Sequence, residues 1–413
     1  MSQLVIALLG RKDEPTDAVE EYSRYLGDAL RTHDIQLEIR RVPWDLRGWS
    51  DALRALQLQS AKWRNTWVLV QYTALAWSAR GFPQKVLRAL KILNSAGARV
   101  GIVFHDVEPY PGSRLIDGIR RLVQVRTMRR ALSRADLGIF TVPLYKLSWL
   151  PFRPRPVAYT DPTAPPPTKM SPHALELAKK NLSAEVFSLI SKHQDELSAP
   201  LDPSPLLPKC HFIPVGPNLP IPLELPAHSA KVTVPTIGVF SITGGESGVR
   251  ETRLILDAVR NASQQLGPLR LSVFGRHAEL REQDLRSGLR GVPVEVSVEG
   301  IVGPVGVVER LSACDVLLFV RGAISTRRSS AIAGIACGVP LVAYVGSETA
   351  YPLTDAGVLL VSPLNPGELN DALVRVLSDS ELRAAMRRKN LTIYSEHFSW
   401  PSIATRFAAL LRM

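Results

Sequence analysis

Short apolar runs alternate with segments of helical periodicity along this chain, and the alternation restricts its fold more than any other feature. The runs at 4–9, 67–71 and 100–104 are continuous, as in strands that are buried on both faces of a parallel sheet. A helical stripe begins after the first run, with Asp17 and Glu20 as the expected capping box. Such βα units predict α/β domains with doubly wound parallel sheets.

The alternation occurs in two blocks, so the 413 residues are predicted to form two domains. Sixteen of the 32 prolines fall between the blocks, at 151–222, where regular structure cannot be continuous. We expect a first domain at 1–222, with a proline-rich insert at about 151–210 that includes one helix, and a second domain at 223–395. Ligands of open α/β sheets bind at the carboxyl ends of the strands, so tandem domains would form a cleft between these ends.

Composition adds a basic bias to an otherwise ordinary globular protein. Lys and Arg number 50 against 38 Asp and Glu, which gives a net charge of +12, most of it within residues 1–220. The three cysteines, Cys210, Cys314 and Cys337, have no CxxC spacing, which argues against a disulfide framework or a zinc site. No apolar run reaches the roughly 18 residues that span a bilayer. We therefore expect a cytoplasmic protein in a reducing compartment.

One loop concentrates groups that could bind an anion. Ser325, Thr326, Arg327 and Arg328 precede a helix of small residues that is expected to begin near Ser329. Hydroxyl groups, two guanidinium groups and free backbone donors would then gather at one helix N-terminus. The alternative is an ordinary capped helix with solvated arginines.

Five segments resemble, in order, motifs of the family 4 glycosyltransferases of the GT-B fold. The segment at 332–344, IAGIACGVPLVAY, is similar to the EAMACGTPVV sequence on the nucleotide-sugar side of the family's cleft. The others are similar to the family's first helix, its strand ending in histidine, its IPNGVD linker and its C-terminal helix; they are TDAVEEYSRYL (16–26), VGIVFHD (100–106), IPVGPN (213–218) and FSWPSIATRF (398–407). The resemblance covers nearly the whole chain.

The resemblance implies a fold of two Rossmann-like domains that face a central cleft. The first domain would bind the acceptor, which is a glycan, a lipid-linked sugar or a small molecule. The second would bind a nucleotide-diphosphate sugar, and the last helix, at 396–413, would cross back to the first domain. The implied reaction is sugar transfer with retention of configuration, as in polysaccharide biosynthesis, with no metal and no cofactor besides the donor substrate.

The chain departs from the family at both of its carboxylates. The Glu-x7-Glu pair, which faces the donor sugar and the ribose, falls on Ser325 and Ala333. The Gly-Gly pair of the first loop falls on Asp17 and Ala18, and the usual Arg and Lys pair is not evident at 241–251.

These departures require another source of positive charge for the diphosphate. Arg327 and Arg328 are the expected substitutes, together with Thr326 and with backbone donors at Gly244 and Gly245.

Four further residues are candidates with weaker patterns. His105 ends a buried strand, and the resemblance implies that it contacts the donor sugar near the reacting carbon, as a catalytic residue beside Ser325. Arg276 is a candidate for the diphosphate, Glu348 for the loop near the donor sugar, and Gly10 for a phosphate. The alternatives are a structural histidine for His105, a solvated arginine for Arg276 and an ordinary polar loop for Gly10.

The segment at 113–134 is predicted to be an amphipathic basic helix, with seven arginines against Asp117. The apolar stripe that is expected to pack on the core consists of Leu115, Ile119, Leu122, Val123 and Leu132. The basic face would also suit peripheral contact with an anionic membrane. Nucleic acid is the competing partner, but no aromatic-interleaved RNA motif or zinc-finger pattern supports it.

Two alternatives to a transferase stay open at this point. One is a sugar-nucleotide epimerase on the same fold, which needs no acceptor. The other is a non-catalytic GT-B protein that binds a nucleotide or a partner, which the two missing carboxylates would explain.

Overall fold

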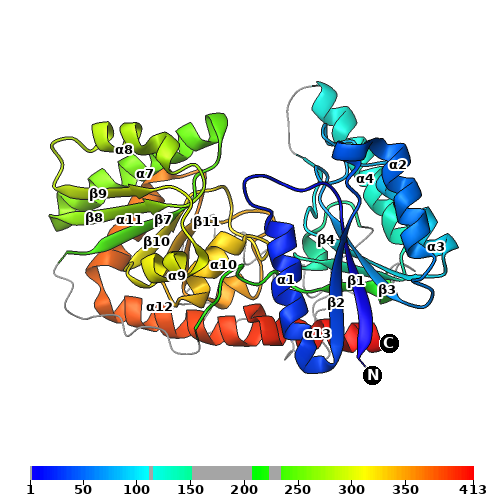
Figure 1. Ribbon diagram of the computed structural model, residues 1–413. Coiled ribbons are helices and arrows are strands. Elements are labelled where there is room, and N and C mark those ends of the chain that lie inside the picture. Colours follow the sequence, from blue (N-terminus) through cyan, green and yellow to red (C-terminus); the bar gives the residue numbers. More distant parts are fainter. Residues whose placement is uncertain (1, 111–114, 151–206, 223–233) are drawn as a thin grey trace. The chain divides into compact units, whose positions relative to one another are not determined.

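The computed structural model describes residues 2–110, 115–150, 207–222 and 234–413. Most of the proline-rich insert, with its expected helix at 173–193, lies outside these residues. The described residues form two compact units: unit 1 extends to Pro214 and includes Trp400–Met413, and unit 2 begins at Val215 and ends at Ser399 (Figure 1). The division precedes residue 222 because the Val215 amide already donates to the Thr326 carbonyl of unit 2, at 3.1 Å.

Unit 1 is built on a six-stranded parallel sheet of order β2-β1-β3-β4-β5-β6. Its strands are β1 (Gln3–Leu9), β2 (Ile35–Arg41), β3 (Trp67–Tyr72), β4 (Arg99–Phe104), β5 (Leu137–Phe140) and β6 (Cys210–Phe212). Its helices are α1 (Ala18–Leu30), α2 (Trp44–Ser60), α3 (Val86–Ser95), α4 (Leu115–Arg134) and α13 (Trp400–Arg412). The predicted strands at 4–9, 67–71 and 100–104 are confirmed.

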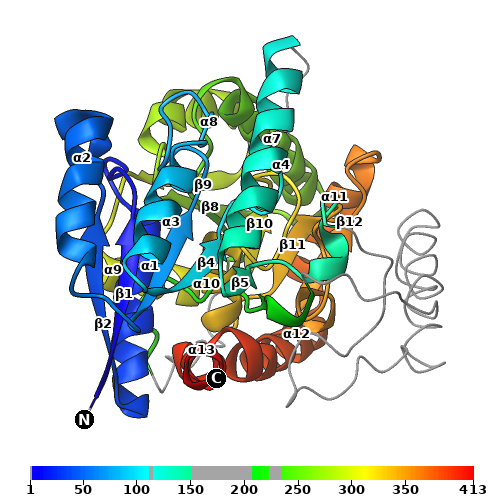
Figure 2. The same cartoon turned by 90° about the vertical axis from the view of Figure 1, so that its right-hand side faces the viewer.

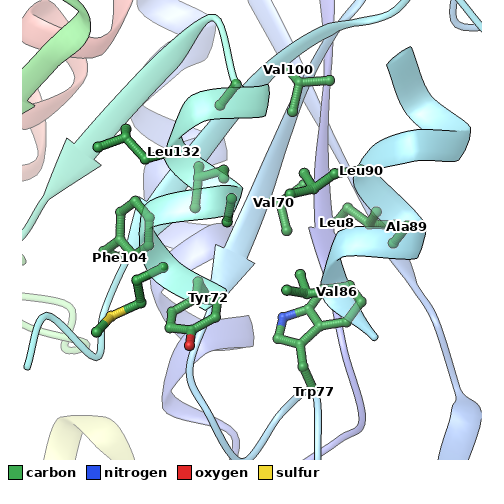
Figure 3. Packing of buried hydrophobic residues seen from close by; sticks show 14 of the residues in the cluster. Leu8, Val70, Tyr72, Trp77, Val86, Ala89, Leu90, Val100, Phe104 and Leu132 are labelled. Carbon is green, nitrogen blue, oxygen red and sulfur yellow. The ribbon is translucent and has the colours of Figure 1, made fainter. Parts of the chain in front are cut away.

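Both faces of this sheet are covered, which explains why its strands β1, β3, β4 and β5 are mostly apolar. Leu8 of β1 and Val70 of β3 lie on one face and pack with side chains of α3 and α4, such as Leu90 and Leu132 (Figure 3). The helices α1 and α13 lie against the other face (Figure 1). Asp17 caps α1 by accepting the amides of Val19 and Glu20 at 3.1 and 3.0 Å. The expected capping box is only half formed, because the Glu20 carboxylate pairs with arginines.

Helix α13 belongs to unit 1 although it follows all of unit 2 in the chain. Trp400 stacks on Tyr25 with 5.7 Å between the ring centroids and meets Tyr22 edge-on at 5.3 Å. The indole of Trp67 donates to the Leu411 carbonyl at 2.8 Å. The C-terminal residues therefore complete the core of the N-terminal sheet.

Helix α4 buries only part of the stripe that the sequence predicts. Ile119 and Leu122 are 50% and 68% exposed, whereas Leu132 is buried as predicted, on a face that also carries Gln124 and Met128. Gln124 is satisfied there, because its side chain donates to the Gly81 carbonyl at 2.9 Å and accepts the Tyr110 amide at 2.7 Å. The predicted orientation was partly wrong, because hydrogen bonds allow polar side chains to occupy the buried face.

Unit 2 is a second six-stranded parallel sheet, of order β12-β11-β10-β7-β8-β9. Its strands are β7 (Thr236–Phe240), β8 (Leu269–Phe274), β9 (Val294–Glu299), β10 (Val316–Phe319), β11 (Leu341–Tyr344) and β12 (Val358–Val361). Its helices are α7 (Gly245–Leu266), α8 (Glu282–Gly288), α9 (Pro304–Ser312), α10 (Ser329–Ala336), α11 (Pro366–Ser378) and α12 (Ser380–Ile393), and a π-helical turn, η6 (Tyr394–Phe398), follows α12. The prediction of doubly wound α/β units is confirmed in both parts of the chain.

Within the described residues, no helix combines the length and apolarity needed to cross a membrane. The three cysteines are free and buried.

Candidate functional site

The strand order of unit 2 places a switch point between β7 and β10. Connections from β7 run outward through β8 and β9, whereas connections from β10 run the other way through β11 and β12. The loops that leave β7 and β10 at their carboxyl ends therefore diverge, and ligands of open α/β sheets bind at such a point. Most of the predicted site residues of this unit lie in these loops or in the loops that follow β8 and β11.

Hydrogen bonds join the loop after β7 to the loop after β8. Ser241 has a φ of +67°, its amide donates to the Phe274 carbonyl at 2.7 Å, and its hydroxyl accepts the Arg276 amide at 3.2 Å. Gly275 has a φ of +97°, and a Cβ there would lie 2.6 Å from the Ser241 hydroxyl. A side chain at Gly275 would separate the loops, so glycine is required for Arg276 to keep its place.

Helix α7 begins at this junction without a side-chain cap. Gly244 is the N-cap residue and Gly245 the first residue of the helix, and both are exposed. The amides of the first turn therefore face solvent, as the predicted role of these glycines requires. Behind them, the buried carboxylate of Glu251 accepts the Thr243 amide at 2.8 Å and holds the loop in place.

Arg321, which follows β10, is the residue of this region that sequence reasoning missed. Its Nε is buried and has no hydrogen-bond partner among the described residues, and its Nη1 lies 3.5 Å from the Ser330 hydroxyl. Burial lowers the pKa of Arg321, the carboxylate of Glu251 opposes this, and the guanidinium of Arg276 adds to it. Two guanidinium groups thus share one region near Glu251.

Arg327 and Glu348, predicted as separate contacts to the donor, are joined in one ion pair. Arg327 Nε and Nη2 donate to the two carboxylate oxygens at 2.7 and 2.9 Å, in the bidentate geometry that suits a guanidinium. Burial alone would raise the pKa of Glu348, but the bonds to Arg327 and the charge of Arg328 outweigh it and hold the pKa below its usual value. Much of the charge of Arg327 is therefore already neutralised.

The rest of the loop positions Arg328 at the start of α10. Arg328 is the N-cap residue of α10 and provides no side-chain cap, and its Nη2 lies 3.9 Å from where a Cβ of Gly322 would be. Ser325 and Thr326 are buried, at 1% and 0% exposure. Ala333, at the second carboxylate position of the family, is also buried, so a glutamate there would lack space and solvent.

The carboxyl edge of this sheet thus has the chemistry of an anion site. Arg276, Arg321 and Arg328 are partly exposed, and two helices begin there with uncapped amides. Such groups stabilise phosphate oxygens by charge and by hydrogen bonds. Within the described residues, no group of three or more His, Cys, Asp or Glu side chains is arranged to hold a metal ion.

His105 lies in unit 1, directly after β4. Its Nε2 is 2.8 Å from Gln71 Oε1, and its ring meets the ring of Tyr22 edge-on with 4.8 Å between centroids. Burial lowers the pKa of His105 to about 4, and the carboxylate of Asp17 opposes the change only in part. The imidazole is therefore neutral at pH 7, and its Nδ1 is the acceptor if Nε2 donates to Gln71.

Gly10 also lies in unit 1, after β1, and is buried. A Cβ there would lie 2.2 Å from the Ala76 carbonyl oxygen, so only glycine allows this close approach. The carbonyl of Gly10 accepts Arg41 Nη1 at 3.2 Å.

The structure thus brings together, in unit 2, the candidates Ser325, Thr326, Arg327, Arg328 and Glu348 in one loop pair, and Gly244, Gly245 and Arg276 in another. His105 and Gly10 belong to unit 1. Of the residues that were missed, Arg321 had a usable pattern, because it directly follows a buried strand. Glu251 and Gln71 had none, because nothing in an amphipathic helix or an apolar strand marks their contacts.

No protein-family model and no curated protein sequence matches this chain. Solved structures do match it. HepE from Anabaena, solved with UDP and glucose, is 14% identical with a TM-score of 0.57 over 99% of both chains. Sucrose-phosphate synthase from Thermosynechococcus elongatus is 15% identical with a TM-score of 0.58 over 99% of this chain and 98% of its own.

A third match, from Listeria monocytogenes, is provisionally named a UDP-N-acetylglucosamine 2-epimerase. It is 11% identical with a TM-score of 0.52, over 100% of this chain and 96% of its own. Identities this low establish the fold alone. The chain has the GT-B fold, with two Rossmann-like domains.

Proposed function

We propose that this protein is a glycosyltransferase, similar to family 4, that transfers a sugar from a nucleotide-diphosphate sugar to an acceptor. The observation that carries the proposal is the buried Nε of the partly exposed Arg321 at the switch point, which has no hydrogen-bond partner among the described residues. A buried donor of this kind is costly unless a ligand satisfies it. HepE, a neighbour in fold, has been solved with UDP-glucose. We therefore take UDP as the first nucleotide to test.

We assign the diphosphate to Arg276, Arg321 and Arg328, with the amides that begin α7 and α10. As the bond to the sugar breaks, negative charge grows on the leaving diphosphate, and fixed cations and amides stabilise it. Arg327 takes a positioning role in this proposal, because its bidentate bond to Glu348 holds the loop that carries Arg328. Retention of configuration and independence of metal follow from the resemblance to the family.

His105 and Ser325 remain the proposed contacts to the donor sugar. A neutral imidazole can accept a hydrogen bond from a sugar hydroxyl at Nδ1, whereas a protonated imidazole cannot. We propose a glycan or a lipid-linked sugar as the acceptor, as in polysaccharide biosynthesis, and assign it to unit 1.

The first test compares thermal unfolding of the protein with UDP, GDP, ADP and dTDP, each with magnesium and with a chelator. A ligand of the folded state at about 100 times its Kd adds about 2.7 kcal/mol to the free energy of unfolding. We expect the largest shift with UDP, equal in both conditions. Absence of a shift with all four nucleotides would contradict the proposal.

The second test is Arg321→Met, with Arg253→Met, at an exposed arginine of α7, as the matched control. Because charged hydrogen bonds contribute about 1.5–3 kcal/mol, we expect UDP affinity to fall about 10- to 100-fold in the first variant only. The ligand-free protein should unfold at the same or a higher temperature, since a buried charge has been removed. UDP binding that matches the unmodified protein would exclude Arg321 from the site.

An epimerase is the second candidate, favoured by the provisional name of the Listeria neighbour. Incubation with a UDP-sugar and no acceptor distinguishes the two functions. A new isomer in the absence of acceptor would identify an epimerase, and transfer that requires an acceptor would identify a transferase. Tight UDP binding without either product would favour a non-catalytic binding protein.

A further inference from the structure

Helix α4 presents an apolar and cationic stripe to solvent. Ile116, Ile119 and Leu122 are 46%, 50% and 68% exposed, and they are followed at helical spacing by the exposed Arg126 and Arg130. The intervals of three, three, four and four residues place all five on one side of the helix. We call these five residues the α4 stripe.

The arginines of α4 divide into two groups. Arg120 pairs with Asp117, Arg129 Nε donates to the Trp149 carbonyl at 2.9 Å, and Arg134 Nη1 donates to the Leu87 carbonyl at 3.0 Å. In contrast, no hydrogen bond or ion pair joins the guanidinium groups of Arg121, Arg126 and Arg130 to the described residues, and all three arginines are exposed. Folding of unit 1 explains the first group and leaves the second unexplained.

The position of the helix keeps the apolar part of the stripe exposed. Figures 1 and 2 both show the N-terminal turns of α4 extending beyond the ends of α2 and α3. The three apolar side chains cover about 9 Å of helix at 1.5 Å per residue. Three large aliphatic side chains grouped in this way are costly to keep in water.

We propose that the α4 stripe docks on a bilayer that contains anionic lipid. The apolar side chains would enter the headgroup and acyl boundary, while Arg126 and Arg130 would contact lipid phosphates. An interfacial helix buries its apolar face to about 5–10 Å, and basic residues strengthen its attachment. Nucleic acid would use the arginines but would leave the three aliphatic residues exposed. This inference does not depend on the proposed function.

The test is cosedimentation of the full chain with vesicles of phosphatidylcholine, with and without one third phosphatidylglycerol. We expect binding only to the anionic vesicles, and weaker binding as salt rises above about 0.1 M, where screening becomes strong. Arg126→Gln with Arg130→Gln should reduce the partition coefficient about 25-fold, from about fivefold per arginine. Arg253→Gln with Arg290→Gln removes the same charge elsewhere and should leave it nearly unchanged.

The apolar part of the stripe needs its own variants. Ile119→Ser with Leu122→Ser should reduce vesicle binding at least tenfold, whereas Leu58→Ser, at a leucine of α2 that is 73% exposed, should not. Because the three native cysteines are buried, Leu122→Cys can be labelled with an environment-sensitive dye. We expect a blue shift with anionic vesicles that the same dye at Leu58→Cys does not show.

Three results would overturn the proposal. They are no binding to anionic vesicles at low salt, equal binding by the serine variant and the unmodified protein, and no blue shift at position 122. The second result would mean that charge alone attracts the protein to the vesicles.

Discussion

The arginines near β10 and α10 differ in how far their guanidinium groups are already paired with other groups of the protein. Arg327 donates two hydrogen bonds to Glu348, whereas the buried Nε of Arg321 has no acceptor in the part of the chain that the structure describes. A guanidinium that is bound to a carboxylate has fewer N–H donors and less uncompensated charge left for a phosphate than one that is not. Two arginines in the same region therefore receive different proposed roles, one in positioning the loop and one in binding.

At the residue scale we predict that the free energy of unfolding depends on pH through the titration of His105. Its pKa is about 4 when folded and about 6.5 when unfolded, so the unfolded chain binds more protons between these values. The stabilisation is complete above pH 6.5 and is lost as the pH falls toward 4. Urea unfolding at several pH values should show a loss of roughly 2 kcal/mol over this range.

The variant His105→Gln removes that titration. The difference in the free energy of unfolding between the two proteins should therefore change across the range from pH 6.5 to 4. A constant difference would mean that His105 is as easily protonated in the folded protein as in the unfolded one.

At the scale of helices and strands, one glycine fixes how α7 meets the loop that precedes it. Gly248 lies in the first turns of α7, and a Cβ there would be 2.0 Å from the Thr243 carbonyl oxygen. A backbone atom cannot rotate away as a side chain can. The uncapped amides at Gly244 and Gly245 therefore depend on this close contact for their direction.

We predict that Gly248→Ala lowers the free energy of unfolding by about 1–3 kcal/mol, because the helix must shift to admit the methyl group. Gly118→Ala, in the first turns of α4, is the matched control, because a Cβ there would meet no atom of the described residues within 4 Å. It should raise stability by about 0.5–1 kcal/mol through helix propensity. Chemical denaturation measures both, and a Gly248→Ala protein as stable as the original would contradict the close contact.

The strands could be predicted from the sequence because they are buried on both faces, which leaves few alternatives for runs such as those at β3 and β4. The orientation of α4 could not, since Gln124 and Asp117 enter its buried face through hydrogen bonds and ion pairs that hydrophobic periodicity does not register. The pairing of Arg327 with Glu348 also could not be predicted from the sequence. The two residues follow different strands, and only the fold brings them together.

At the scale of the whole molecule, the described residues of unit 1 do not form one continuous stretch, because Trp400–Met413 belongs to it and follows unit 2. Phe407 of α13 is fully buried in unit 1, whereas Met386 of α12 is buried in the core of unit 2. The chain passes from one unit to the other at Ser399, an extended residue between η6 and α13.

We predict that Phe407→Ala destabilises unit 1 by about 3–5 kcal/mol, because it leaves a cavity beside α1. Hydrogen exchange should increase in β1, β2 and α1 and stay unchanged in β7 and β10. Met386→Ala should give the opposite pattern. Increased exchange throughout both units in either variant would show that they unfold as one.

The return of α13 to the first sheet also affects how the protein is made. Domains usually fold in the order of their synthesis. Here the surface of unit 1 that receives Trp400, Phe407 and Leu411 stays uncovered until the ribosome has finished every strand of unit 2. The nascent chain therefore has an exposed apolar surface on unit 1 while unit 2 is being synthesised. The domain whose synthesis starts first is completed last.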